Sequence, residues 1–527
     1  MISVAENTLR HTQSAVVPAL GLVVLYVFLT LWNSKPRVPP NIPILRVSSL
    51  PGKRGEQEDL EAFQRNASEV IQHGYELYSK KGKHFLLRTP KGFYFIVAPQ
   101  FIEEIRKAPE TLLSAMDSNN QILQVKYTLH PTLDHDWYEF RVIHTDITRN
   151  LGPALPDLAD QIQISTAREI GSPQEWAAVH MWPACLQIVT QTTNRSFFGK
   201  EIANNDEFTR LASNFAYVVF GGARIIDKYP HCLRPFILRQ QTNVVQIRAL
   251  AKRLLGPMLK DRILRMQDAR RTGCEEQFKH EKPFDVVQWV LDIAPPKEYN
   301  DIDLLIARML HVVVSAVHTS SQTFLDLLYD LTLHPEVIEE LRKEIQTVLA
   351  QEGGWSLNTL SRMIKLDSFI KESSRHRPFT SGSLERNAMV DFTLSDGSVI
   401  TKGTHLSLPH LSIMFDKDIY GPDADQFNAF RFSDMRTDLT PKHTFVHCTP
   451  AYLHFGYGRY ACPGRFFASA EMKMLLSQVL MEYDVRYPAG QAEPKATWYG
   501  WFRTADQTLK LEWRKRVKSD TFVKVSE

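Results

Sequence analysis

The amino-acid sequence predicts a mainly α-helical protein with small β-sheets, preceded by one N-terminal transmembrane helix. Three observations support this prediction: an uncharged apolar segment near the N-terminus, helical periodicity over most of residues 137–335, and β-type patterning in only a few short stretches. The chain has 527 residues, of which 43% are hydrophobic, so it can form a large core. Its 62 basic and 59 acidic side chains nearly balance, without a long run of one sign, which argues against a nucleic-acid-binding protein.

The N-terminal apolar segment runs from Ser14 to Trp32 and contains no charged residue. As a helix rising about 1.5 Å per residue, it would span about 28 Å, which matches the core of a bilayer. A cleaved signal peptide is the alternative, but its apolar region is usually shorter. Lys35 and Arg37 follow the segment and only Arg10 precedes it, so the positive-inside rule places the bulk of the protein in the cytosol.

These features divide the chain into a membrane anchor (residues 1–32), a proline-rich hinge (33–44) and one large domain (45–527). The closely spaced prolines of the hinge form a stiff spacer. Within the domain we predict the following elements in order: a helix over 59–80, a hairpin over 84–99 turning at residues 90–92, a small β region over 391–400 turning at 396–397, a helix over 465–483, and a hairpin around 498–513.

The segment FGYGRYACPGR, Phe455–Arg465, surrounds one cysteine with glycines and a proline. The glycines allow a tight loop with inward amide hydrogens, and Pro463 suits the first turn of the following helix. Cys462 would then lie at a helix N-terminus, where N–H donors lower the pKa of a thiol. Such a thiolate can attack a substrate, bind a metal or exchange disulfides, and its apolar flanks suit an axial ligand of haem iron. A buried, inert cysteine is the alternative.

This loop resembles the haem-binding loop of the cytochrome P450 monooxygenases. Their pattern, Phe-x-x-Gly-x-Arg/His-x-Cys-x-Gly, is matched by Phe455, Gly458, Cys462 and Gly464, while Tyr460 stands where the family usually has an arginine or histidine that contacts a haem propionate. The resemblance implies the cytochrome P450 fold, with residues 45–527 as the haem-thiolate catalytic domain. It also implies haem b (iron protoporphyrin IX) as cofactor and Cys462 as the iron ligand.

Two further motifs match the family. Glu372 and Arg375 in KESSR match its Glu-x-x-Arg, and Arg431 in FNAFRF matches its downstream arginine, with Ala429 in place of a proline. By resemblance these three charged residues form a buried ion cluster that positions the haem loop. Without the resemblance, a pair three residues apart on a helix is usually solvent-exposed.

A Trp-x-x-x-Arg motif is present in WYEFR, where Trp137 and Arg141 would contact a haem propionate by resemblance. Arg386, at the end of LER, resembles the family's further propionate arginine. On its own, the first pair could be an aromatic–cation contact on a surface helix.

A long apolar helix carries a polar stripe of Ser315, His318, Thr319 and Gln322, spaced at i, i+3, i+4 and i+7. Hydroxyls that bond back to their own helix would explain such a stripe without any function. The run from Ser315 to Ser320 resembles the family's Ala/Gly-Gly-x-Asp/Glu-Thr-Thr/Ser. By this resemblance Thr319 is the catalytic threonine that helps deliver protons during oxygen activation. His318 replaces the acid and can also shuttle protons near neutral pH.

The resemblance extends over nearly the whole chain and is greatest to the fungal branch that tailors terpenoids and related secondary metabolites. It implies a monooxygenase that inserts oxygen from O2 into an apolar small molecule, such as a terpenoid or meroterpenoid intermediate. Because the sequence has no flavin or nicotinamide fingerprint, the resemblance implies a separate NADPH-cytochrome P450 reductase as partner. The anchor would lie in membrane lipid of the endoplasmic reticulum as a single-pass segment, with the catalytic domain facing the cytosol.

The segments expected to shape the substrate pocket are the loop before Trp137, the helix near Ala316, Phe379–Ser383 and the tip Trp498–Phe502. Three alternatives stay open at this stage. The chain could be a haem-thiolate isomerase or dehydratase that needs no reductase, an oxidase acting on a polyketide or alkaloid, or a non-catalytic haem- or lipid-binding protein.

Overall fold

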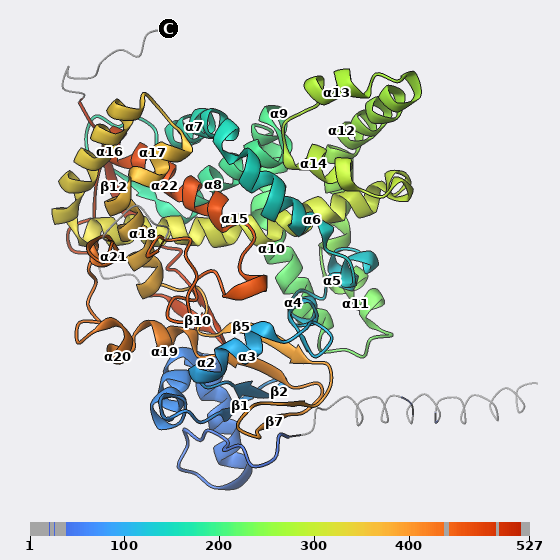
Figure 1. The fold of residues 1–527 in the computed structure, drawn as a ribbon, viewed down its shortest axis with the longest axis vertical. Helices are drawn as coiled ribbons and strands as arrows, with labels where there is room; N and C mark the ends of the chain where they lie inside the picture. Colours follow the sequence, from blue (N-terminus) through green and yellow to red (C-terminus); the bar gives the residue numbers. More distant parts are fainter. Residues whose placement is uncertain (1–20, 22–25, 27–37, 437–441, 492–494, 518–527) are drawn as a thin grey trace, which may run out of the picture.

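The computed structural model describes residues 21, 26, 38–436, 442–491 and 495–517. The predicted anchor, residues 14–32, lies outside the described residues apart from Gly21 and Tyr26. The sheet-bearing part of the chain, its helical part and the long helix between them lie within the described ranges (Figure 1).

The main sheet has five strands in the order β1-β2-β8-β5-β3. Its strands are β1 (Phe85–Thr89), β2 (Gly92–Ile96), β3 (Leu113–Ser114), β5 (Ser383–Ala388) and β8 (His405–Leu408). β1 and β2 form the predicted hairpin, paired antiparallel from Phe85 with Ile96 to Thr89 with Gly92. β2 then pairs in parallel with β8, which brings a distant part of the chain into the same sheet.

Three small sheets complete the β structure of the described residues. The predicted turn at residues 396–397 is confirmed, because β6 (Phe392–Thr393) and β7 (Val399–Ile400) pair antiparallel around Gly397, whose φ is 84°. The predicted C-terminal hairpin is confirmed in part: β10 (Thr497–Tyr499) pairs with β11 (Phe502–Thr504). β12 (Lys510–Lys515) instead joins another sheet, between β4 (Ala177–His180) and β9 (Tyr483–Arg486).

Helices make up most of the remaining structure. Their bounds are α2 (Gly52–Leu77), α3 (Ile102–Lys107), α4 (Ala115–Leu123), α5 (Val125–Thr128), α6 (Tyr138–Val142), α7 (Thr148–Ile170), α8 (Met181–Phe198), α9 (Lys200–Ala203), α10 (Asp206–Ile226), α11 (Arg234–Gln241), α12 (Val244–Thr272), α13 (Glu275–Glu281), α14 (Val286–Ile293), α15 (Ile302–Leu333), α16 (Ile338–Glu352), α17 (Leu357–Arg362), α18 (Ile364–His376), α19 (His410–Met414), α20 (Lys417–Tyr420), α21 (Arg431–Asp434) and α22 (Arg465–Glu482). The predicted helix over 59–80 is α2, and that over 465–483 is α22.

The long helix α15 crosses the middle of the helical part, with α22 beside it (Figure 1). It begins where the side chain of Asp301 accepts a hydrogen bond from the Leu304 amide at 3.0 Å. Among the described residues, α15 is the one helix long and apolar enough to span a membrane, but 67% of its most apolar window is buried inside the protein. It is therefore the central helix of the main hydrophobic core, which also contains residues of α7, α8, α18 and α22.

Candidate active site

Cys462 lies in a loop closed by short backbone hydrogen bonds. Its amide donates to the Phe455 carbonyl at 2.7 Å, and the Gly456 amide donates to the Leu453 carbonyl at 2.8 Å. Gly456 and Gly458 have φ angles of 71° and 79°, a region that glycine adopts at low cost. α22 begins at Arg465, so the cysteine directly precedes a helix, as the sequence predicts.

The electrostatic setting of the Cys462 thiol differs from the expectation. Burial raises the pKa of the thiol, while hydrogen bonds from the Gly464 and Arg465 amides and the charge of Arg465 act in the opposite direction. Burial has the larger effect, and the net shift of the pKa is upward. The prediction of a lowered pKa for the Cys462 thiol is therefore wrong for the protein without a bound group. The donors at the helix N-terminus do lower the pKa, but removal of the thiol from water raises it by more.

The cysteine loop is docked on α3 by contacts that sequence reasoning missed. The Tyr457 hydroxyl donates to Oε1 of Glu103 at 2.9 Å, and the Arg106 guanidinium lies 5.2 Å from the centre of the Tyr457 ring. The Arg106 side chain also runs directly past Gly458, where an added Cβ would lie 2.2 Å from Cγ of Arg106. Gly458 is therefore required both by its positive φ and by this close approach. No local pattern signals the contact, because its partners are far apart in the sequence.

The otherwise buried helix α15 is opened to solvent over one short stretch. Ser315 is exposed, and Ala316, His318, Thr319 and Ser320 are half-buried, whereas the residues before and after them are mostly buried. The Thr319 hydroxyl donates to the Ser315 carbonyl at 2.8 Å, and the Ser315 hydroxyl donates to the His311 carbonyl at 3.1 Å. Hydroxyls bonded in this way satisfy the polar groups of the stripe and remain at the surface of the opening.

The other two residues of the predicted stripe point elsewhere. The His318 ring makes edge contacts with Tyr217 of α10 and tilted contacts with Trp182 of α8, at centroid distances of 4.6 and 6.3 Å. Within the described chain neither ring nitrogen of His318 has a hydrogen-bond partner, and burial lowers its pKa to about 4. Gln322 donates to the Arg503 carbonyl at 3.0 Å. His318 is therefore neutral at pH 7.

The three residues expected to contact cofactor carboxylates lie on two separate elements. Trp137 precedes α6, and its indole N–H donates to the Leu133 carbonyl at 2.5 Å, while Arg141 on α6 is exposed. Arg386 lies in β5 with only 4% of its surface exposed, and its guanidinium is 5.0 Å from the centre of the Tyr460 ring.

Arg386 provides a test of whether a haem fits these residues. Its guanidinium donates to the Glu385 carbonyl, and no carboxylate of the described residues lies within ion-pair distance of it. Burial lowers its pKa. A buried guanidinium without a carboxylate is unfavourable, so the site has a place for an external carboxylate. Together with a thiol at the start of α22 and an open face on α15, which packs against α22, this donor set fits a haem with its propionates.

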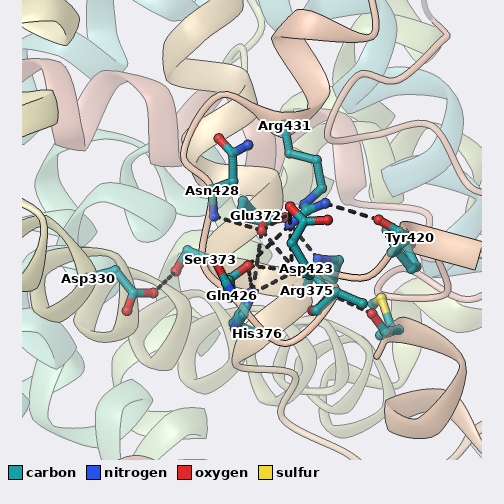
Figure 2. A network of polar contacts seen from close by, with 12 residues as sticks. Asp330, Glu372, Ser373, Arg375, His376, Tyr420, Asp423, Gln426, Asn428 and Arg431 are labelled. Carbon is teal, nitrogen blue, oxygen red and sulfur yellow. Dashed lines mark hydrogen bonds and ion pairs between the residues drawn. The ribbon is translucent and has the colours of Figure 1, made fainter. Parts of the chain in front are cut away.

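Glu372, Arg375 and Arg431 are brought together as a buried ion cluster (Figure 2). Arg375 donates to both carboxylate oxygens of Glu372 at 2.8 Å, and Nε of Arg431 donates to Glu372 at 3.1 Å. Burial alone would raise the pKa of Glu372, but the hydrogen bonds and charges of Arg375 and His376 lower it to about 2. Glu372 therefore stays ionised, and Arg375 also donates to the carbonyl of Met414, so the cluster joins α18 to the segments after it.

Two of the four segments expected to shape a substrate pocket, the hairpin tip and Phe379–Ser383, are linked by hydrogen bonds. Arg503, in the hairpin β10–β11, donates both terminal nitrogens to Asp326 of α15 at 2.7 Å, and its amide donates to the Phe379 carbonyl at 3.0 Å. The Ser381 amide donates to the Trp501 carbonyl at 2.9 Å. The hairpin tip and the segment after α18 are therefore attached to each other and, through Asp326, to the central helix.

Comparison with known proteins agrees with this geometry. The sequence model of the family described as cytochrome P450 matches residues 61–511. Cytochrome P450 monooxygenase AN1598 of Emericella nidulans is 32% identical over 85% of this chain and 82% of its own length. Cytochrome P450 monooxygenase olcJ of Penicillium canescens is 34% identical over 76% of this chain and 75% of its own, and paxP of Penicillium paxilli is 30% identical over 92% of both.

Proposed function

We propose that this chain, which belongs to the cytochrome P450 family, oxidises an apolar terpenoid or meroterpenoid in fungal secondary metabolism. Family membership makes the chain an oxidoreductase of the monooxygenase class that uses haem. The observation that carries the proposal is that the Cys462 loop leads into α22, which packs against α15, and that α15 is open to solvent around Thr319. When bound, thiolate-ligated haem supplies the reductive activation of dioxygen.

The cofactor would be haem b, held by several residues of this chain. Cys462 would ligate the iron, and Arg386 and Arg141 would bind the propionates. Trp137 would join them by exchanging the Leu133 carbonyl for a propionate oxygen as the acceptor of its one N–H. Phe455, Gly458 and Gly464 would shape the loop around the thiolate. Tyr460, which lies against Arg386, keeps a hydroxyl but no charge at the position of the family's basic residue.

Thr319 would move protons within the site. Its hydroxyl is half-buried at the opening of α15 and donates to the Ser315 carbonyl, so the lone pairs of Oγ1 can accept a hydrogen bond from a water molecule in the site. His318 would assist as a neutral imidazole, since its pKa of about 4 leaves it uncharged at neutral pH.

An apolar substrate is favoured by exposed aromatic side chains, one at the opening of α15 and one in the hairpin β10–β11. Tyr217, which contacts His318, is 44% exposed, and Phe502 in the hairpin is 40% exposed. Large aromatic surfaces with few polar groups suit a bulky apolar ligand. The fungal origin of the relatives supports a role in fungal metabolism. The terpenoid class rests on the sequence resemblance.

The electrons would come from NADPH-cytochrome P450 reductase. The apolar segment 14–32 would anchor the chain in membrane lipid of the endoplasmic reticulum, with the catalytic domain in the cytosol. Both proposals rest on the sequence and the family.

The test is an assay with the purified full-length chain, the reductase, NADPH, ¹⁸O-labelled dioxygen and a panel of terpenoid and polyketide skeletons. We expect one labelled oxygen atom in the product, and the reaction to need both reductase and oxygen. Cys462→Ala serves as the matched control and should lose both turnover and the red-shifted absorption of the reduced carbon monoxide complex. Turnover without reductase would instead support an isomerase or dehydratase and contradict the proposal.

A further inference from the structure

A buried arginine on α15 forms ion pairs with carboxylates from two other parts of the chain. The side chain of Arg308 is 0% exposed, and its Nη1 donates to Glu139 of α6 at 2.7 Å. Its Nε and Nη2 donate to the two carboxylate oxygens of Glu298 at 3.0 Å, and Nη2 also donates to Asp136 at 3.0 Å. The Tyr138 ring packs on the guanidinium, with its centre 3.7 Å away. Because each of the three guanidinium nitrogens of Arg308 donates a hydrogen bond, the position of this planar group is fixed.

Glu139 uses its second oxygen to hold another residue of α15. Oε1 of Glu139 accepts a hydrogen bond from Nδ1 of His311 at 2.8 Å, and both side chains are buried. An ionised carboxylate can only accept, so this contact requires the proton of His311 on Nδ1. Glu139 therefore bridges Arg308 and His311, which lie almost one turn apart on α15.

The His311 ring packs against two aromatic residues at α6, so its orientation affects theirs. Its ring lies edge-to-face against Trp137, with a centroid distance of 5.3 Å, and against Phe140 at 4.7 Å. The orientation of the imidazole, set by Glu139, therefore limits the positions open to the Trp137 indole.

α6 is the first part of a longer helix. Tyr138–Val142 continues through a single π-helical turn over Ile143–Ile147 into α7, and the residues at both junctions keep right-handed helical angles. The first turn of a helix is held less firmly than its middle, because its N–H groups have no partners within the helix. Glu139 ties this first turn to α15 and so bears on the direction in which Trp137 and Arg141 point.

We propose that Glu139, held by Arg308 and His311, is a positioning residue that orients Trp137 and Arg141 for the carboxylates of the cofactor. The proposal rests on the proposed function in that it assumes a haem at this site. Residues that orient metal ligands typically contribute about ten- to a hundredfold to metal affinity, and we expect a similar scale for haem retention. Arg308 stands out in the sequence as the one basic side chain other than histidine in the apolar run LLIARMLHVVV.

The test measures haem loss from the holoenzyme by transfer to haem-free myoglobin. Glu139→Ala removes the bridge but leaves Arg308 paired with Glu298 and Asp136, so the variant keeps its buried charge compensated. We expect haem transfer to become about tenfold faster or more. Glu139→Gln, which retains an acceptor for Arg308, should restore part of the difference.

A double-mutant cycle separates positioning from general destabilisation. In a Trp137→Phe/Arg141→Ala background, Glu139→Ala should add little further acceleration, because the residues that it positions are gone. The matched control is Asp285→Asn, which breaks the buried bidentate pair of Arg262 and Asp285 between α12 and α14. This control should lower stability without accelerating haem transfer.

Each outcome decides the proposal. Unchanged haem transfer in Glu139→Ala, acceleration equal to that of Asp285→Asn, or full additivity in the cycle would overturn it. A wild-type protein that retains haem but forms no labelled product would refute the proposed function and leave this comparison valid. A wild-type protein that binds no haem would overturn both.

Discussion

Glu372 and Arg375 form an ion pair in which both side chains are 0% exposed, although only three residues separate them on α18. Arg431 joins the same carboxylate from a segment almost 60 residues further along the chain. Pairs at this spacing are usually exposed and contribute little. Here burial changes their role, since each member compensates a charge that water cannot reach.

Replacing Glu372 with glutamine should therefore destabilise the protein strongly. Arg375 and Arg431 would stay buried without their shared carboxylate, and losing one partner of a buried pair costs about 3–5 kcal/mol. The measurement is the free energy of unfolding in urea. Glu339→Gln is the matched control, because Glu339 pairs with Arg342 at the same spacing but is 78% exposed. A loss below about 1 kcal/mol in Glu372→Gln would contradict the prediction.

The same carboxylate should make stability depend on acidic pH. The pKa of Glu372 is lowered from 4.5 to about 2 in the folded chain. A lowered folded-state pKa stabilises the protein fully above the unfolded value, and this contribution disappears as pH falls from about 4.5 towards 2. We expect the difference in unfolding free energy between wild type and Glu372→Gln to shrink over that pH window. A difference that stays constant from pH 5 to pH 2.5 would show that another group carries the charge effect.

Local patterns were sufficient to predict several elements of the fold. Alternation and turn residues located the hairpin β1–β2 and the turn between β6 and β7, and continuous helical periodicity located α22. These features depend on neighbouring residues, so the sequence displays them directly. The C-terminal hairpin was predicted too long, because β12 pairs with the distant strands β4 and β9.

Contacts between distant residues could not be predicted in this way. Nothing near Gly458 indicates that Arg106 lies against it, and nothing near Glu139 indicates a bridge to Arg308 and His311. The polar stripe on α15 shows the same limit. Its residues spread over about 100° of the helix surface, and neighbouring helices decide that Thr319 lies at the opening while His318 packs on Tyr217.

Gly458→Ala should disrupt the cysteine loop. The new Cβ would lie 2.2 Å from Cγ of Arg106, at a residue whose φ of 79° already disfavours a side chain. We expect a smaller fraction of protein with the red-shifted absorption of the reduced carbon monoxide complex, and partial recovery when Arg106→Ala is added. Gly397→Ala is the matched control, because its φ is 84° but nothing lies within 4 Å of an added Cβ. Equal behaviour of the two variants would contradict a role for the Arg106 contact.

Asp326→Asn should loosen the hairpin β10–β11. Asp326 holds Arg503 through two hydrogen bonds of 2.7 Å in a buried ion pair, and this pair attaches the hairpin to α15. We expect amide hydrogen exchange in residues 497–504 to become about tenfold faster, corresponding to about 1.4 kcal/mol of local stability. Glu512→Gln, which removes the exposed pair with Arg486, should leave exchange there unchanged. Equal protection of the hairpin in wild type and Asp326→Asn would show that its other contacts suffice.

Thr319→Ala should separate NADPH consumption from product formation. The Thr319 hydroxyl is half-buried at the opening of α15, where it can exchange protons with water, and alanine cannot. We expect the variant to retain haem and consume NADPH with the reductase, while a larger share of the electrons appears as hydrogen peroxide. Ser321→Ala is the matched control: the Ser321 hydroxyl donates to the Val317 carbonyl at 2.7 Å in the same helix, but it is fully buried away from the opening. Since both substitutions remove one hydroxyl that bonds back to α15, only the position of the lost group differs. Unchanged coupling in Thr319→Ala, or equal uncoupling in both variants, would show that the proton route does not pass through Oγ1 of Thr319.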